Sequence, residues 1–155
     1  MIETGQEIYL TNLLSFRKQL TQTEVQKEMN SIESFIKDNN LTVVGPKIST
    51  TYSLTQSMTP TIDIEILIPV DKEFNGTDMY KLKKEFKLIN CLKVSHKGNP
   101  MTFQNTIINL QKHIENNKLI PISSLYTVNI KEAKTPEEME NFQADAYISI
   151  SPNVL

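Results

Sequence analysis

The sequence predicts an α+β fold, in which duplicated β-α-β-β units form one antiparallel sheet with two long helices on one face and a central cleft on the other. Three observations lead to this prediction. The stretch 61–70 alternates aliphatic and other side chains, as a strand does, and the stretch 144–152 repeats the pattern at the end of the chain. Two amphipathic helices with the same apolar spacing precede them. We expect the two copies to cover residues 6–70 and 86–152.

The totals fit one domain spanning residues 1–155, which would bury about 70% of the surface that its unfolded chain exposes. The single cysteine, Cys91, excludes an internal disulfide and favours a reducing, cytoplasmic setting. We expect no signal peptide and no membrane span, since no segment approaches ~20 apolar residues. The net charge is −2 and Arg17 is the only arginine, which argues against direct nucleic-acid binding.

The first copy opens with a strand over 7–16, interrupted at Asn12. A helix follows over 21–38, and Thr21 with Glu24 forms a capping-box pattern at its start. The apolar stripe of this helix consists of Val25, Met29, Ile32 and Ile36. Because the stripe lies along one side, we expect that side to pack on the sheet.

A strand over 47–54 and a turn over 55–60 lead into the central strand, 61–70. In that strand one face is aliphatic and the other carries the carboxylates of Asp63 and Glu65. The aliphatic face is made by Ile62, Ile64, Ile66 and Ile68. This alternation predicts a sheet with one apolar side.

The second copy follows a loop over 71–77 and a short helix predicted at 78–85. The lysines of that helix, Lys81, Lys83 and Lys84, are interpreted as a solvated face. A strand over 86–97 then corresponds to the first strand of the chain.

A turn at Gly98 separates this strand from the second helix, with Asn99 as its N-cap and Pro100 at its first position. The stripe of the helix consists of Phe103, Ile107, Leu110 and Ile114. A strand near Tyr126, a loop over 132–141 and the final strand complete the copy. In this alignment Asp145 corresponds to Asp63.

The stretches Asp63–Val70 and Val94–Pro100 resemble motifs of the gyrase-inhibitor-like small-molecule-binding domains. The same fold serves as the effector-binding domain of multidrug-sensing bacterial transcription activators and is related to SOUL-type haem-binding proteins. The resemblance implies a ligand cleft where the two halves meet, with an acid that pairs with cationic ligands. The chain departs from the family by one inserted residue, Asn99, and by having no tryptophan.

Seven residues are candidate ligand contacts: Glu65, Tyr52, Tyr126, Tyr147, Tyr9, Asp63 and Asp145. The acids would pair with a cationic group, and the tyrosine rings would line the cleft. The alternative is that alternation places the acids on a solvated sheet face, and that the tyrosines fill half-buried strand surface.

The remaining reactive side chains give no catalytic or metal motif. No serine or cysteine nucleophile with an orienting acid can be read from the sequence around His96, since the adjacent Ser95 would point to the opposite face of the strand, and His113 lies inside the second helix. Two isolated histidines are weak evidence for a metal or haem, so we expect no cofactor and no metal site. Cys91 is interpreted as a small buried apolar side chain.

The favoured function is therefore a stand-alone, non-enzymatic domain that binds a small, partly apolar and cationic molecule. Two alternatives stay open. One is an accessory protein that binds a protein partner, since the chain is also similar to single-domain proteins encoded beside type VII secretion toxins. The other is a hydrolase based on Glu65, since some proteins of this fold are hydrolases.

Overall fold

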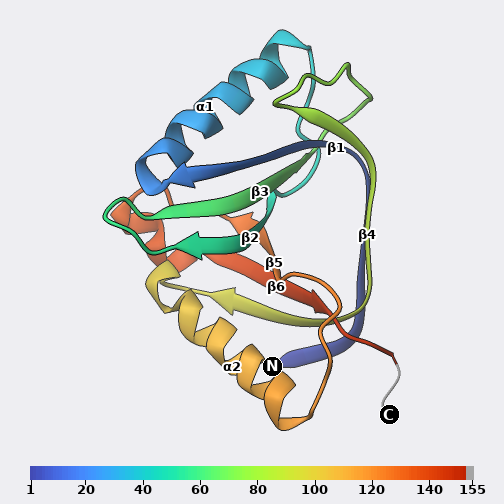
Figure 1. Ribbon diagram of the computed structural model, residues 1–155, viewed down its shortest axis with the longest axis vertical. Helices are drawn as coiled ribbons and strands as arrows, with labels where there is room; N and C mark the ends of the chain where they lie inside the picture. The colour runs from blue at the N-terminus through green and yellow to red at the C-terminus, as the bar shows by residue number, and fades with distance from the viewer. Residues whose placement is uncertain (153–155) are drawn as a thin grey trace. The chain divides into compact units, whose positions relative to one another are not determined.

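The computed structural model describes residues 1–152, and the chain divides into two compact units. Unit 1 comprises Met1–Ile8 and the chain from Lys87 onward, and unit 2 comprises Tyr9–Phe86. The order strand, helix, strand, strand occurs twice along the chain (Figure 1), and all strand pairs within the units are antiparallel. The predicted α+β class is confirmed. That the two halves are copies related by a twofold axis stays a prediction.

Unit 2 is organised around its central strand, as the sequence predicts. Its elements are β1 (Ile2–Thr21, from Tyr9 onward), α1 (Gln22–Asp38), β2 (Ile48–Thr55), β3 (Thr61–Pro69) and the start of β4 (Lys81–Lys97). Strand β3 lies between β1 and β2, with Phe16 opposite Ile66 on one side and Ser49 opposite Ile66 on the other. Figure 1 shows β1, β3 and β2 side by side, with α1 along one face.

The core of unit 2 forms where α1 packs on that face. The predicted stripe residues Ile32 and Ile36 are buried, and they pack with apolar side chains of β1 and β3. The strand residues in this cluster are Leu14, Phe16, Leu20, Ile66 and Ile68. Burial of these side chains is the main term that holds helix and strands together.

Unit 1 has the same internal arrangement around its last strand. Its elements are the start of β1, the remainder of β4, η1 (Pro100–Thr102), α2 (Phe103–Asn116), β5 (Tyr126–Lys131), η2 (Pro136–Asn141) and β6 (Gln143–Ser149). Strand β6 pairs with β4 on one side and with β5 on the other. The predicted stripe of α2 packs on apolar side chains of β4, of β6 and of the residue that follows β6, which are Leu92, Val94, Ala146, Ile148 and Ile150.

The predicted helix starts are confirmed. At α1 the backbone N–H of Thr21 donates to Glu24 Oε2 at 3.1 Å, which is one half of the capping box. At η1 the side chain of Asn99 accepts from the N–H of Met101 at 2.9 Å, and Pro100 follows as the first residue of the turn. Both caps satisfy backbone donors that a helix leaves without a partner.

The predicted interruption of the first strand occurs at Asn12, whose φ is 56°. Asparagine tolerates this left-handed conformation better than most residues do. The Asn12 carbonyl accepts from the N–H of Val70 at 2.8 Å. Unit 1 repeats this arrangement: Asn90 has φ 51°, and its carbonyl accepts from the N–H of Ile150 at 3.1 Å. These two contacts fix where the residue after β3 and the residue after β6 lie against the neighbouring strands β1 and β4.

The short helix predicted at 78–85 is wrong. The chain makes a turn in which Thr77 and Tyr80 are bonded to each other, and β4 begins at Lys81. Lysines have good helix propensity, but a segment of eight residues is too short to offset the cost of starting a helix. As part of β4, the residues from Lys81 onward pair with a neighbouring strand instead. The first strand is likewise longer than predicted, and the loop 132–141 contains η2.

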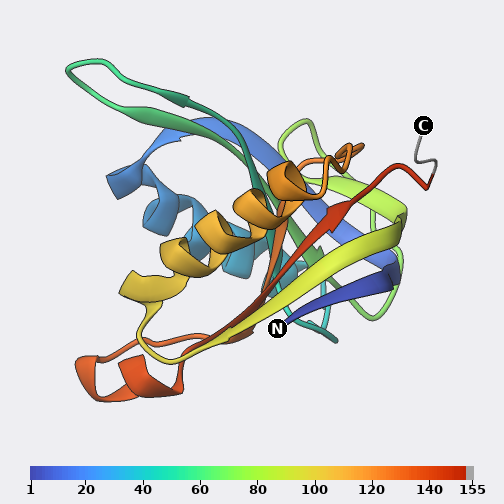
Figure 2. The ribbon, with the colours of Figure 1, turned by 90° about the horizontal axis from the view of Figure 1, so that it is seen from below.

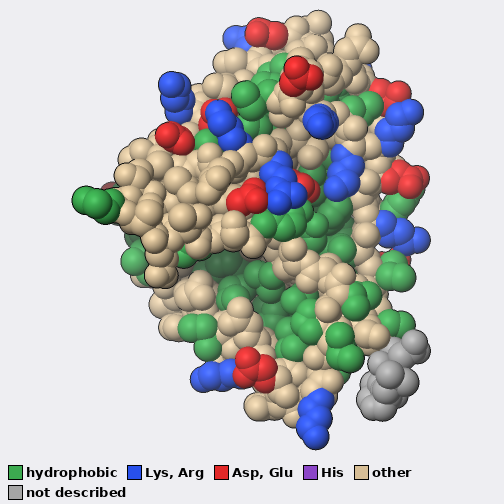
Figure 3. All heavy atoms as spheres, viewed as in Figure 1, with side chains coloured by type: hydrophobic (Ala, Val, Ile, Leu, Met, Phe, Trp, Pro, Cys, Tyr) green, Lys and Arg blue, Asp and Glu red, His purple; other side chains and the backbone are tan. Residues whose placement is uncertain are grey.

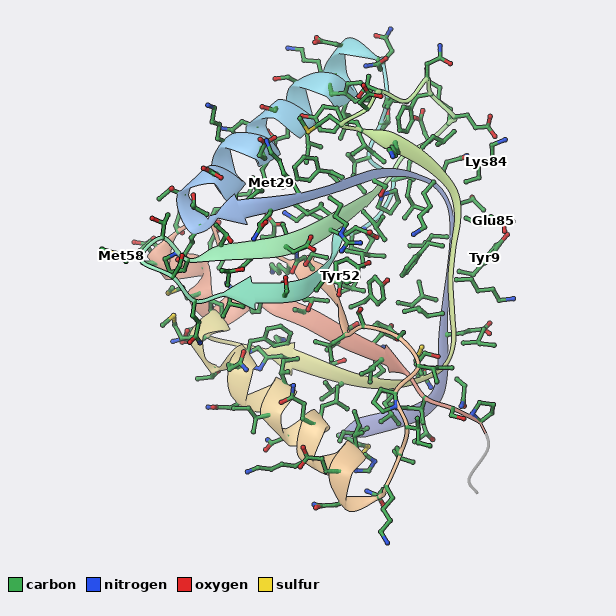
Figure 4. The ribbon with its side chains drawn as sticks, in the orientation of Figure 1. Tyr9, Met29, Tyr52, Met58, Lys84 and Glu85 are labelled. Carbon is green, nitrogen blue, oxygen red and sulfur yellow. The ribbon has the colours of Figure 1, made fainter. Side chains whose placement is uncertain are left out.

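The β2–β3 hairpin projects from unit 2. The pairing continues to Thr55 opposite Thr61, and Figure 2 shows the tip of the hairpin extending away from β1 and α1. Met58 at the tip is fully exposed (Figure 4).

Among residues 1–152, no helix combines the length and the apolar character that crossing a bilayer requires.

Candidate functional site

Glu65 lies in the middle of β3, the most enclosed strand of unit 2. Its neighbours across the ladder are Arg17 on β1 and Thr50 on β2. Only 9% of the residue surface is exposed, and Thr50 opposite it is also buried. The interpretation of this acid as part of a solvated sheet face is therefore wrong. A charged side chain placed here needs partners, since its own hydration has largely been removed.

Tyr52 supplies one partner, by means of an irregularity in β2. The pairing with β3 shifts between Thr51 and Ser53, so that Tyr52 is the extra residue of a β-bulge. A bulge turns a side chain out of its regular direction. Here the Tyr52 hydroxyl donates to Glu65 Oε2 at 3.2 Å, while 39% of the tyrosine stays exposed.

The other oxygen of the carboxylate is left without a hydrogen bond. Within the described residues, Glu65 Oε1 is buried and has no hydrogen-bond partner. Lys83 Nζ of β4 lies 3.8 Å from it, close enough for charge attraction but too far for a hydrogen bond. An oxygen in this state is an open acceptor, because a donor that reaches it would recover the cost of its lost hydration.

The cationic group next to this acid is Arg17. Its guanidinium donates two hydrogen bonds to Asp63, at 3.1 and 2.9 Å, and its Cζ lies 3.9 Å from the centre of the Tyr52 ring. Figure 3 shows acidic and basic side chains lying together on this face of β1 and β3. The hydrogen bonds raise the pKa of Arg17 and, against the effect of burial, hold the pKa of Asp63 below its ordinary value of 3.8. Both hydrogen bonds of the Arg17 guanidinium thus go to Asp63, and neither goes to Glu65.

This pair makes a testable contribution to acid stability. Because the pKa of Asp63 is lower in the folded chain, the pair stabilises the fold fully above pH 3.8 and loses its effect as the pH falls through the folded value. The stability difference between the wild type and Asp63→Asn should therefore be constant near pH 6 and vanish towards pH 2. Urea unfolding at low salt measures it. Glu33→Asn on the exposed side of α1 is the control, and a difference that persisted at pH 2 would contradict the assignment.

In unit 1 the corresponding acid is Asp145, which is 7% exposed and lies between Ser95 and Val128. The amides of Val70 and Ile150 make equivalent contacts in the two units, and Glu65 and Asp145 lie equally far before them in the sequence. Asp145 therefore has the position in unit 1 that Glu65 has in unit 2. Its predicted correspondence with Asp63 is therefore wrong. The reason is that the chain between Asn90 and Ile150 in unit 1 is longer than the chain between Asn12 and Val70 in unit 2.

The surroundings of Asp145 resemble those of Glu65. Its Oδ1 is buried with no hydrogen-bond partner in residues 1–152, and Lys93 Nζ lies 3.7 Å from Oδ2. The same ammonium lies 5.7 Å from the centre of the Tyr147 ring, and Tyr126 is opposite Tyr147 in the ladder. Burial alone would lower the pKa of Lys93, but Tyr147 and Asp145 raise it, so Lys93 carries its charge. Burial raises the pKa of Tyr147, which keeps its hydroxyl neutral.

Tyr9 is not part of these groups. It precedes Arg17 on β1 by about 26 Å of strand, and its hydroxyl donates to Glu85 at 3.0 Å. That bond raises the pKa of Tyr9. Figure 4 shows Tyr9 beside Glu85 and well away from Tyr52. The sequence could not show this, because alternation indicates a face of a strand and not a position along it.

The histidines have local structural contacts. His96 Nε2 lies 3.0 Å from the carbonyl of Asn99, to which it must donate, and Nδ1 lies 2.9 Å from the hydroxyl of Thr106. The ring also packs against Phe103 and Phe142, so these contacts connect the turn at Asn99 to α2. Cys91 is fully buried, as predicted, and burial raises the pKa of its thiol.

No cluster of three or more His, Cys, Asp or Glu side chains in residues 1–152 could hold a metal ion. Two grooves of about 610 and 510 Å³ lie on unit 1, and neither is lined by a predicted ligand residue. The first runs beside Ile114, Lys118 and Pro121, and the second lies between β4 and α2 at Ser95 and His113. The candidate sites are therefore the two acidic groups, on the strands themselves.

Lys83, Lys93 and Arg17 complete these groups, and sequence reasoning missed all three. Lys83 was interpreted as part of a solvated helix face, and nothing local distinguishes it from Lys84. Only the pairing of strands brings Lys83 to Glu65 while leaving Lys84 exposed. For Lys93 a signal exists, since it alternates with the buried Leu92 and Val94 on a strand that faces the acid-bearing final strand.

Comparisons with known proteins concern the fold. No protein-family model matches the chain, and no curated protein matches it. Among solved structures, the chain is similar to the C-terminal domain of EcmrR, with a TM-score of 0.76, 15% identity and 97% of each chain covered. In the complex of EcmrR with DNA in EcmrR-RPo, where the TM-score is 0.75 at 15% identity, the match covers 97% of this chain but only 57% of the EcmrR chain.

Two further structures are similar over most of their length. One is SAV2435 bound to tetraphenylphosphonium, with a TM-score of 0.58, 8% identity, and 98% and 93% of the two chains covered. The other is a hydrolase from Listeria innocua, with a TM-score of 0.61, 14% identity, and 97% and 91% covered. At these identities the similarity concerns the fold alone. It agrees with the fold that the resemblance in the sequence implied.

Proposed function

We propose that this chain is a non-enzymatic small-molecule-binding domain, and that Glu65 and Tyr52 bind the positive charge of a partly apolar organic cation. The observation that carries the proposal is the buried carboxylate oxygen Oε1 of Glu65, which lacks a hydrogen bond. An acid with this cost to stability is expected where a ligand, rather than the fold, completes its environment.

The chemistry of the group matches a cation. Glu65 supplies a charge that little water screens, and Tyr52 supplies a half-exposed ring held in place by its hydroxyl. A cation over a tyrosine ring gains about 0.5–2 kcal/mol, more when water is excluded. Arg17 lies over this ring at 3.9 Å, which supports the proposal that the ring attracts positive groups.

Asp145 and Tyr147 form a similar group within unit 1, with Tyr126 beside Tyr147. We assign it the same role towards a positively charged part of a ligand. Among proteins of similar fold, the structure of SAV2435 with tetraphenylphosphonium supports the choice of a lipophilic cation as the ligand class.

Isothermal titration with tetraphenylphosphonium tests the proposal. We expect the wild type to bind, and Glu65→Gln, which keeps the size of the side chain and removes its charge, to weaken binding about tenfold or more, equivalent to ~1.4 kcal/mol. Tyr52→Leu should weaken it less, because only the ring contact is lost.

The matched control is Glu85→Gln, which removes an exposed acid of unit 2 that bonds Tyr9 instead. It should bind like the wild type. Equal loss in Glu65→Gln and Glu85→Gln would indicate attraction by net charge alone and would overturn the site. Absence of binding to the wild type would overturn the ligand class.

A further inference from the structure

Each buried acid of the two groups faces a lysine at nearly the same separation. Lys83 Nζ lies 3.8 Å from Glu65 Oε1, and Lys93 Nζ lies 3.7 Å from Asp145 Oδ2. Each acid has an oxygen that no described residue bonds. The two lysines come from different parts of β4, one in each unit. A buried acid beside a lysine that does not hydrogen-bond it therefore occurs once in each unit, although Lys83 lies nearest the unbonded oxygen of Glu65 and Lys93 lies nearest the other oxygen of Asp145.

Both ammonium groups also lie near an aromatic ring. Lys83 Nζ is 5.5 Å from the centre of the Phe86 ring, and Lys93 Nζ is 5.7 Å from that of Tyr147. An acid and an aromatic face are the two features that the proposed ligand would use. Each lysine thus lies next to the acid that the proposed ligand would use, without making a hydrogen bond to it, and Lys93 also lies near Tyr147, a tyrosine of the proposed site.

We propose that Lys83 and Lys93 are displaceable counterions, which occupy the cation positions of the two sites until an organic cation replaces them. This proposal rests on the function proposed above and concerns the selectivity of the same site. The lysine side chain suits the role because its ammonium is strongly hydrated and its four-carbon chain is flexible, so that it gains water when it leaves. Lys83 has a short path to solvent, since 40% of its side chain is already exposed.

Because a ligand must replace the lysine, a cation binds only if it interacts with the site more favourably than the lysine does. A small hydrated ion offers Glu65 little more than Lys83 does, and so it does not compensate for breaking the pair. A weakly hydrated aromatic cation gains ring contact and burial of apolar surface in addition. The sites should therefore favour lipophilic cations over simple amines, and this preference should depend on the lysines.

Titration of tetraphenylphosphonium into Lys83→Met tests this. Methionine keeps much of the length and apolar stem of the side chain but removes the charge. We expect the dissociation constant to fall about three- to fivefold relative to the wild type, because the partly exposed Lys83 contributes only a modest attraction to Glu65, and in the variant this attraction no longer competes with the ligand. Lys93→Met should show a change in the same direction.

The control variants are Lys84→Met and Lys97→Met, which remove exposed lysines of the same strand. They change the net charge equally and should leave the dissociation constant near that of the wild type. An equal gain in the controls would mean that overall charge, rather than displacement, raises the affinity, and would overturn the inference.

Comparison with Glu65→Gln separates this inference from the proposed function. If the wild type binds and Glu65→Gln does not, while Lys83→Met binds no better than Lys84→Met or binds more weakly, the binding site stands and the counterion role is overturned. If no variant binds the probe, both are overturned.

Discussion

Replacing Phe16 with alanine is expected to lower the free energy of unfolding by about 3–5 kcal/mol. Phe16 has 0% exposure and lies in the cluster between α1 and the strands of unit 2, and its ring is 5.9 Å from that of Tyr80. Removal of the ring leaves a cavity that rigid strands on both sides cannot fill. The lost burial and the lost packing therefore add. Urea unfolding followed by far-UV circular dichroism measures the change.

A matched substitution at the edge of the same cluster provides the control. Phe74 packs against Phe35 with 5.7 Å between ring centres but is only partly buried. Phe74→Ala should cost clearly less than Phe16→Ala, because solvent can fill part of the space. Similar costs at the two positions would show that the core of unit 2 does not centre on Phe16.

Replacing Glu65 with methionine should make the protein more stable, by about 1–2 kcal/mol. The substitution removes a buried charge whose Oε1 has no hydrogen bond and fills the space with an apolar side chain of similar length. Little is lost in return. The Tyr52 hydroxyl, on a residue that is 39% exposed, regains a partner from water, and the pair with the half-exposed Lys83 contributes little.

The control is Glu85→Met, which exchanges an exposed acid on β4 for the same side chain. It should change stability by no more than about 0.5 kcal/mol. A loss of stability in Glu65→Met would mean that the fold requires this carboxylate, and would remove the argument for a ligand. If Glu65→Met is more stable than the wild type and no longer binds tetraphenylphosphonium, the carboxylate serves binding at a cost in stability, as residues of binding sites often do.

Local features of the sequence predicted most of the secondary structure correctly. The stripe of α1, the cap at Asn99 and the alternation of β3 each depend on neighbours within a few residues, and each is present in the structure. The helix predicted at 78–85 failed because propensity alone could not show that a neighbouring strand would pair with that segment.

The candidate site was predicted only in part. Glu65, Asp145, Tyr52 and Tyr147 were singled out from their types and their places on strands, and the structure brings them together in pairs within their own units. Which acid would be buried and which would be paired was open, because Asp63 and Glu65 lie on the same face of one strand. Arg17 decides between them by reaching diagonally across the ladder to Asp63.

The sequence alone determined the two long helices, the presence of the strands, the apolar faces that join them and the burial of Cys91, since periodicity and capping are short-range properties. Only the tertiary structure decided that Tyr52 sits at a bulge, that Tyr9 lies elsewhere, and that Lys83 and Lys93 stand next to the buried acids. These facts depend on strand register, which brings together residues far apart in the chain, and a shift of one residue would turn each side chain to the opposite face.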